Sequence, residues 1–232
     1  MFPAKLGDLN FCRKHLEAAV KPATTAPSQY GAAFRELPIS VESCYVLPVW
    51  HASFTVIGTQ ALYAYEAVAG SHFLLELLAS GDVDLLYDAR QKMTVVSEKL
   101  DGEGLLGLLK KADKTFECVR ENGYRAANAG QFMIDLVIAP RGMQASENIT
   151  FSKADLVATE VPGLQWLLNS PKLEAVAIDE DGWPVPMRVP DPRAFALHKA
   201  WLSEEMPHLP FESTLTSLHG DVRKMLPMLI PA

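Results

Sequence analysis

The sequence predicts an α+β protein with a small mixed β-sheet, flanking helices and a C-terminal region that consists of a hairpin and further helices. Short apolar runs rich in β-branched and aromatic residues stop at Gly or Pro, which is typical of buried strands. Stretches with apolar residues at helical spacing lie between these runs. Strands mixed with helices in this order indicate an α+β core with a helical appendage.

The first predicted strand covers residues 52–57 and stops at Gly58. A helix is predicted to follow over residues 61–69, with Thr59 as its N-cap and Gly70 as the residue that closes it. The sequence therefore predicts a strand, a tight Gly-Thr turn and a helix in direct succession.

Two further predicted strands carry carboxylates. Residues 81–88 alternate as a strand does, with Asp82 and Asp84 on one face near its start. Residues 132–138 form a strongly apolar strand with a single carboxylate, Asp135. Between the two strands, the pattern predicts a helix over residues 105–112 and a strand or hairpin over residues 115–127 with a turn at Asn122-Gly123.

Three regions are expected along the chain. Residues 1–50 are a helical lead-in, residues 51–145 are the sheet-bearing core, and residues 146–232 are a hairpin and helical region that caps the cleft. The elements predicted outside the core are an amphipathic helix over residues 8–20, a hairpin over residues 173–189, a helix over residues 193–202 that begins with Asp191-Pro192, and a final helix over residues 214–229.

Composition narrows the class of protein. Hydrophobic residues make up 49% of the chain and charged residues 21%, as in a globular protein. No apolar run approaches the roughly 20 residues of a membrane helix, and the start of the chain lacks the pattern of a signal peptide, so a cytoplasmic location is expected. The net charge of −7 argues against a broad nucleic-acid footprint. The three cysteines form no CxxC pair and are expected to be core residues.

The acidic residues have the spacing of a cation site. Asp82 and Asp84 place two carboxylates about 7 Å apart on one face of a strand, where they repel each other unless a cation lies between them. Oxygen ligands of this kind suit Mg²⁺. A neighbouring strand would bring Asp135 beside the pair, and the Gly58-Thr59 turn before a helix N-terminus suits phosphate.

Each of these features also has a simpler structural explanation. An Asp-x-Asp sequence at a strand start is often a solvated turn or a helix cap. Asp135 alone can be a buried acid paired with an arginine such as Arg125. Arg90 is expected to pair with Asp88 rather than to bind phosphate. What favours an active site is the order of these features: a strand, Gly-Thr, a helix, a strand with Asp-Val-Asp and a strand with a lone Asp.

This order resembles the nucleotidyltransferase superfamily of the DNA polymerase β-type fold, in which Gly and a small residue precede a strand with two Asp one residue apart. More closely, the chain is similar to a bacterial group of uncharacterised nucleotidyltransferase-like proteins. It departs from the superfamily in having Thr59 where Ser or Gly is commoner, and a longer gap between Gly58 and Asp82. The similar segments are Val56–Ala67, Gly81–Arg90, Gly104–Leu109, Phe132–Leu136 and Pro190–Lys199.

The resemblance implies a reaction and its residues. It implies transfer of a nucleoside monophosphate from an NTP to an acceptor hydroxyl, with Mg²⁺ or Mn²⁺ as cofactor. The catalytic and metal-binding residues that it implies are Asp82, Asp84 and Asp135, and the residues implied to contact the triphosphate are Gly58, Thr59 and Lys199.

Two other functions are considered beside this one. The first is a toxin-like nucleotidyltransferase that modifies tRNA, which basic clustering beside the cleft would favour. The second is a non-catalytic nucleotide-binding or interaction protein of the same fold. Proteins of similar fold modify RNA, antibiotics or other proteins, so the sequence leaves the acceptor, the base preference and the oligomeric state open. No membrane partner is expected.

Overall fold

The computed structural model of this protein describes residues 54–70, 73, 78, 80–90, 104–142, 148–178 and 184–205. The helices predicted over residues 8–20 and 214–229 lie outside the described residues, as does the turn of the C-terminal hairpin. None of the helices in the described part of the chain has the length and apolarity that a membrane span requires.

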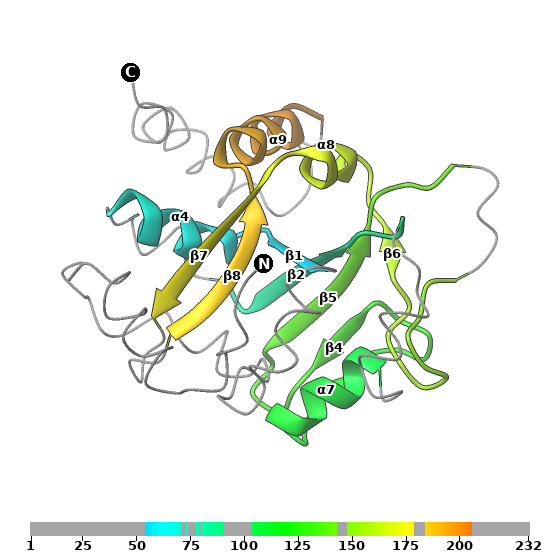
Figure 1. The fold of residues 1–232 in the computed structure, drawn as a ribbon. Coiled ribbons are helices and arrows are strands. Elements are labelled where there is room, and N and C mark those ends of the chain that lie inside the picture. Colours follow the sequence, from blue (N-terminus) through cyan, green and yellow to red (C-terminus); the bar gives the residue numbers. More distant parts are fainter. Residues whose placement is uncertain are drawn as a thin grey trace, which may run out of the picture.

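A mixed six-stranded sheet forms the centre of the molecule (Figure 1). Its strands follow the spatial order β1-β2-β5-β4-β3, and β6 pairs with β5. β5 is parallel to β2 and β6, whereas the other pairs are antiparallel. The strands are β1 (Phe54–Ile57), β2 (Asp82–Tyr87), β3 (Glu117–Cys118), β4 (Arg125–Ala127), β5 (Met133–Ile138) and β6 (Thr159–Glu160).

The helices and a separate hairpin surround this sheet, which confirms the predicted α+β class. In Figure 1, α7 lies near one end of the sheet and α8 and α9 lie together at the other. The hairpin is a second, two-stranded sheet. These elements are α4 (Ala61–Ala69), α7 (Gly104–Ala112), α8 (Leu164–Asn169), β7 (Lys172–Ile178), β8 (Pro184–Pro190) and α9 (Pro192–Glu205).

The two faces of the main sheet belong to different parts of the core. One face is apolar along β2 and β5, and its residues share a core cluster with α7 and the 149–156 segment. The other face carries the acidic residues at the start of β2 and apolar residues toward the ends of β2 and β5. Those apolar residues, Leu86, Val137 and Ala139, cluster with Leu164 and Leu167 of α8 and with Ala194 of α9.

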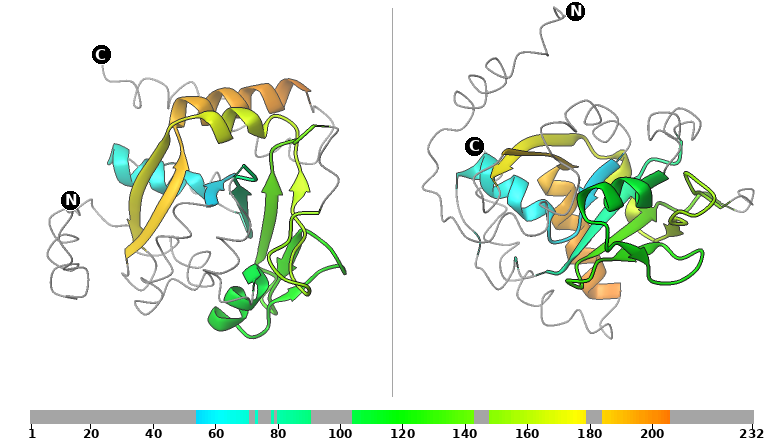
Figure 2. Two further views of the ribbon diagram at one scale, coloured as in Figure 1. Left: turned by 45° about the vertical axis from the view of Figure 1, so that its right-hand side comes forward. Right: turned by 90° about the horizontal axis from the view of Figure 1, so that it is seen from below.

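The C-terminal hairpin is joined to the first strand and the first described helix. β8 lies against β1, and α4 lies against both β7 and β8. The buried hydroxyl of Tyr65 on α4 donates a hydrogen bond to the carbonyl of Pro190 at 3.0 Å, just before α9 begins. The two views of Figure 2 show α9 following the hairpin and passing over the main sheet. The fold thereby brings α9 to the acidic face.

Most predicted elements agree with the structure, with two differences. The N-cap of α4 is Gln60, with no side-chain cap bond, so the prediction of Thr59 is wrong. The carbonyl of Gly58 already accepts a bond from the N–H of Ala61 at 3.3 Å, so the turn runs straight into the helix and the Thr59 hydroxyl is not its cap. The second difference is that β6 and α8 were not expected.

Candidate active site

A single row of paired residues crosses four strands at the acidic face. Ile57 on β1 pairs with Asp84 on β2, and Asp84 pairs with Asp135 on β5. Asp135 in turn pairs with Arg125 on β4. Because directly paired residues point to the same face of a sheet, this register places Asp84, Asp135 and Arg125 on one face. Asp82, two residues before Asp84, points to that face as well.

Asp84 lies against the glycine that ends β1. Gly58 has a φ of 70°, in the left-handed region that glycine adopts without strain. A Cβ atom added to Gly58 would overlap Oδ2 of Asp84, nearer than real Cβ atoms approach. In this structure the carboxylate of Asp84 therefore occupies the space beside Gly58.

Asp82 is held at the turn that leads into β2. The hydroxyl of Ser80 donates a hydrogen bond to Oδ1 of Asp82. The carbonyl of Ser80 accepts a bond from Nε2 of Gln60 at 3.2 Å, so this turn is tied to the start of α4. Gln60 is buried, and its Oε1 atom has no hydrogen-bond partner among the described residues.

Sequence reasoning missed Gln60 and Ser80. Their only signal was position, because Gln60 directly follows the Gly-Thr pair and Ser80 lies two residues before the first Asp. The structure makes them the link between the two halves of the site.

Asp135 is paired with Arg125. Nε and Nη2 of Arg125 donate to Oδ1 and Oδ2 of Asp135, each at 2.6 Å. Asp135 is buried, so this two-pronged bond supplies the partner that a buried charge requires. The structure thus shows the arginine pairing that the sequence left open as one explanation of Asp135.

Lys199 reaches the acidic face from α9. Burial lowers the pKa of Lys199, and the nearby carboxylates of Asp84 and Asp82 oppose this by raising it. Its Nζ atom lies 5.5 Å from the centre of the Phe195 ring on the same helix. The structure therefore places this lysine, predicted to contact triphosphate, near two of the predicted metal ligands.

The acidic face is electrostatically crowded at Asp84. The pKa of Asp84 is raised to about 6, mainly by burial and also by the negative charges of Asp82 and Asp135. Lys199 and Arg125 act in the opposite direction and lower it. A site with this balance favours additional positive charge, which a divalent cation provides.

The donor atoms fit Mg²⁺ or Mn²⁺ in kind, because all three candidate ligands are carboxylates. Among the residues that the structure describes, no three His, Cys, Asp or Glu side chains converge as a ready metal-binding group. Asp84 leans against Gly58, whereas Asp135 is bonded to Arg125 on the other side of the row. Ligation by all three carboxylates stays a prediction.

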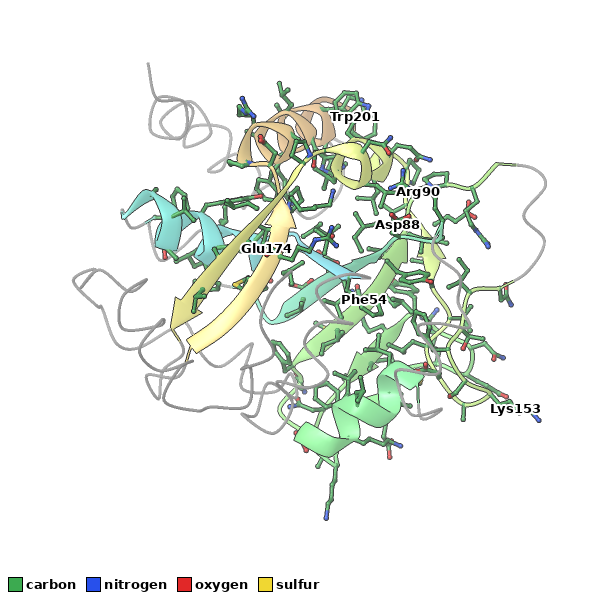
Figure 3. All side chains as sticks on the ribbon, viewed as in Figure 1. Phe54, Asp88, Arg90, Lys153, Glu174 and Trp201 are labelled. Carbon is green, nitrogen blue, oxygen red and sulfur yellow. The ribbon has the colours of Figure 1, made fainter. Side chains whose placement is uncertain are left out.

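Arg90 does not contribute to this face. Its Nε and Nη2 atoms donate to Asp88 at 2.8 and 2.7 Å, which confirms the expected ion pair (Figure 3). Its Nη1 atom donates to Oδ1 of Asn169 at the end of α8, at 2.9 Å. Arg90 thus links the strand that carries the acids to a covering helix.

Comparison with known proteins identifies a family. A family model described as nucleotidyltransferase matches residues 46–210, which is more than half of the chain. Searches of curated proteins and of solved structures gave no match. The matched range contains all six predicted site residues: Gly58, Thr59, Asp82, Asp84, Asp135 and Lys199. The chain therefore belongs to this nucleotidyltransferase family, whose general reaction is nucleotidyl transfer from a nucleoside triphosphate.

Proposed function

We propose that this chain transfers a nucleoside monophosphate from an NTP to an acceptor hydroxyl, with Mg²⁺ or Mn²⁺ held by Asp82 and Asp84 and also by Asp135. The observation that carries the proposal is the cross-strand row that puts Asp84 beside Gly58 and in register with Asp135. The raised pKa of Asp84 supports it, since crowded negative charge favours a bound cation.

The proposed reaction needs charge neutralisation and positioning. The acceptor oxygen forms a bond to the α-phosphorus, the bond from that phosphorus to pyrophosphate breaks, and the acceptor proton is released to water. When bound, the cation neutralises phosphate charge and lowers the pKa of the attacking hydroxyl. Lys199 supplies a further positive charge from α9, and the Gly58-Thr59 turn presents backbone N–H groups before α4.

Calorimetric titration of each NTP, with and without Mg²⁺, tests the proposal. We expect Mg²⁺-dependent binding by the wild-type protein and its loss in an Asp82→Asn, Asp84→Asn double variant, because the substitutions remove both charges with little change of shape. Asp88→Asn is the matched control. It removes a carboxylate that lies just beyond the end of the same strand and forms an ion pair with Arg90. It should bind NTP as the wild type does.

The outcomes separate an enzyme from a binding protein. Mg²⁺-independent NTP binding that survives the double substitution would favour a non-catalytic nucleotide-binding protein. The absence of NTP binding by the wild-type protein in Mg²⁺ would overturn the proposal. Binding that depends on Mg²⁺ and on the two Asp would identify the nucleotide with which to seek the acceptor.

A further inference from the structure

A two-pronged ion pair joins Arg125 and Asp135 at the acidic face. Both oxygens of the carboxylate accept charge-assisted bonds of 2.6 Å from the guanidinium group. Each bond uses one of the two lone pairs of its oxygen, and the guanidinium charge balances that of the carboxylate. While it holds Arg125, Asp135 therefore offers a cation fewer free lone pairs and a weaker attraction.

The position of Asp135 in the sheet gives it two alternative neighbours. Arg125 is its direct partner on β4, and Asp84 is its direct partner on β2. All three side chains lie on one face of the sheet, so a change of partner at Asp135 would take place on that face.

Arg125 is exposed enough to move away from Asp135. Its side chain is 34% exposed, whereas that of Asp135 is only 7% exposed. The guanidinium carbon also lies 5.8 Å from the centre of the Tyr124 ring, and Tyr124 is itself exposed. A released Arg125 thus retains solvent and an aromatic neighbour, while Asp135 would be left as a buried charge unless a cation replaced the arginine.

We propose that Arg125 is a positioning residue that competes with the divalent cation for Asp135. Asp82 and Asp84 form the open part of the site, and Asp135 becomes a ligand only when the cation displaces Arg125. This inference rests on the proposed metal-dependent function, and it adds that Asp135 is bonded to Arg125 until a cation binds. Arg125 thereby lowers the affinity for a cation in the absence of nucleotide.

Titration of Mn²⁺ alone, followed by calorimetry and by the electron paramagnetic resonance signal of free Mn²⁺, tests this proposal. We expect Arg125→Gln to bind Mn²⁺ about tenfold more tightly than the wild type, because no positive group then competes for Asp135. Arg125→Lys keeps the charge but loses the fork, so its affinity should lie between the two. If Arg125→Gln does not fold, Arg125→Lys alone must still show tighter binding.

Two controls give the increase its meaning. Adding Asp135→Asn to Arg125→Gln should abolish the increase in affinity, because the released ligand is then missing. Arg120→Gln removes the same charge from the exposed turn between β3 and β4, so it should leave the affinity as in the wild type. Tighter binding in Arg120→Gln would show that net charge, rather than release of Asp135, explains the effect.

Failure of this inference is distinct from failure of the proposed function. Mn²⁺ binding by the wild type with equal or weaker binding by both Arg125 variants would overturn the competition and leave the metal site standing. No Mn²⁺ binding by any of the proteins, with or without NTP, would overturn the metal site and the competition together.

Discussion

The carboxylate of Asp84 occupies the space that any side chain at residue 58 would need. Gly58 therefore meets two requirements, a positive φ and the absence of a Cβ atom. Gly70, at the end of α4, meets only the first, since it has a φ of 61° and open space around it. Gly70 therefore serves as a comparison that has the backbone strain of Gly58 without the contact with Asp84.

We expect Gly58→Ala to lower the free energy of unfolding by about 2 kcal/mol or more, because left-handed strain and overlap with Asp84 add together. Gly70→Ala should lower it by about 1 kcal/mol through strain alone. Gly58→Ala should also weaken Mg²⁺-dependent NTP binding, since Asp84 must move. Chemical denaturation and calorimetry measure the two effects, and unchanged NTP affinity in Gly58→Ala would contradict the role assigned to Gly58.

The sequence predicted the faces of the strands better than the contacts of their side chains. Spacing alone put Asp82 and Asp84 on one face, because side chains alternate along any strand. The pairing of Asp135 with Arg125 stayed one of two explanations, since it depends on the register between β4 and β5. That register is set by the turn at residues 128–131 and by packing across the sheet, neither of which a pattern in one strand reveals.

At the level of elements, α7 is held at its start by a residue from a distant loop. Oδ2 and Oδ1 of Asp155 accept bonds from the backbone N–H groups of Leu105 and Leu106 at 2.8 and 2.7 Å. A Cβ atom on Gly104 would overlap this carboxylate. Asp155 thereby satisfies two N–H groups at the buried start of the helix.

We expect Asp155→Ala to lower the free energy of unfolding by about 2 kcal/mol or more, since it leaves two buried donors without a partner. Asp191→Ala is a comparison at a more exposed helix start, because Oδ1 of Asp191 accepts the backbone N–H of Arg193 at 2.8 Å and its Nε at 3.0 Å at the start of α9. Its loss should be about 1 kcal/mol. Equal losses in urea denaturation would show that burial of the cap does not matter.

Element prediction failed where elements are too short to show a period. β6 has only two residues, and its strand character comes from pairing with Val137 and Ile138 of β5. α8 has six residues and begins after Gly163, which has a left-handed φ of 83°. Tertiary packing of Leu164 and Leu167 stabilises this helix more than its own sequence does.

At the level of the whole molecule, one core extends from the main sheet to the C-terminal elements. Its buried residues include Val83 and Leu136 of the sheet, Phe151, Met187 of the hairpin and Phe195 of α9. The regions predicted as residues 51–145 and 146–232 both contribute to it. A free-energy change on α9 should therefore alter the unfolding of the whole molecule rather than the fraying of one helix.

The protonation of His198 on α9 provides such a free-energy change when the pH is varied. Its ring is buried, and both ring nitrogens have no hydrogen-bond partner in the part of the chain that the structure describes. The pKa of His198 is lowered from 6.5 to about 4, mainly by burial and also by the positive charge of Lys199. Between these two values the unfolded chain binds a proton that the folded chain does not, so the folded state loses stability as the pH falls.

We expect His198 to make its full contribution to the free energy of unfolding above pH 6.5. This contribution should decline by up to about 3 kcal/mol as the pH falls toward 4. Asp84 acts in the opposite sense, because its raised pKa lets the folded state bind a proton first. The difference between the wild type and His198→Phe, which keeps an aromatic ring but cannot titrate, isolates the histidine. Urea denaturation from about pH 7 to about pH 4.5 should show a smaller acid-induced loss in the variant. Parallel losses in the two proteins would mean that His198 is accessible to protons in the folded state, and that α9 opens without the rest of the core.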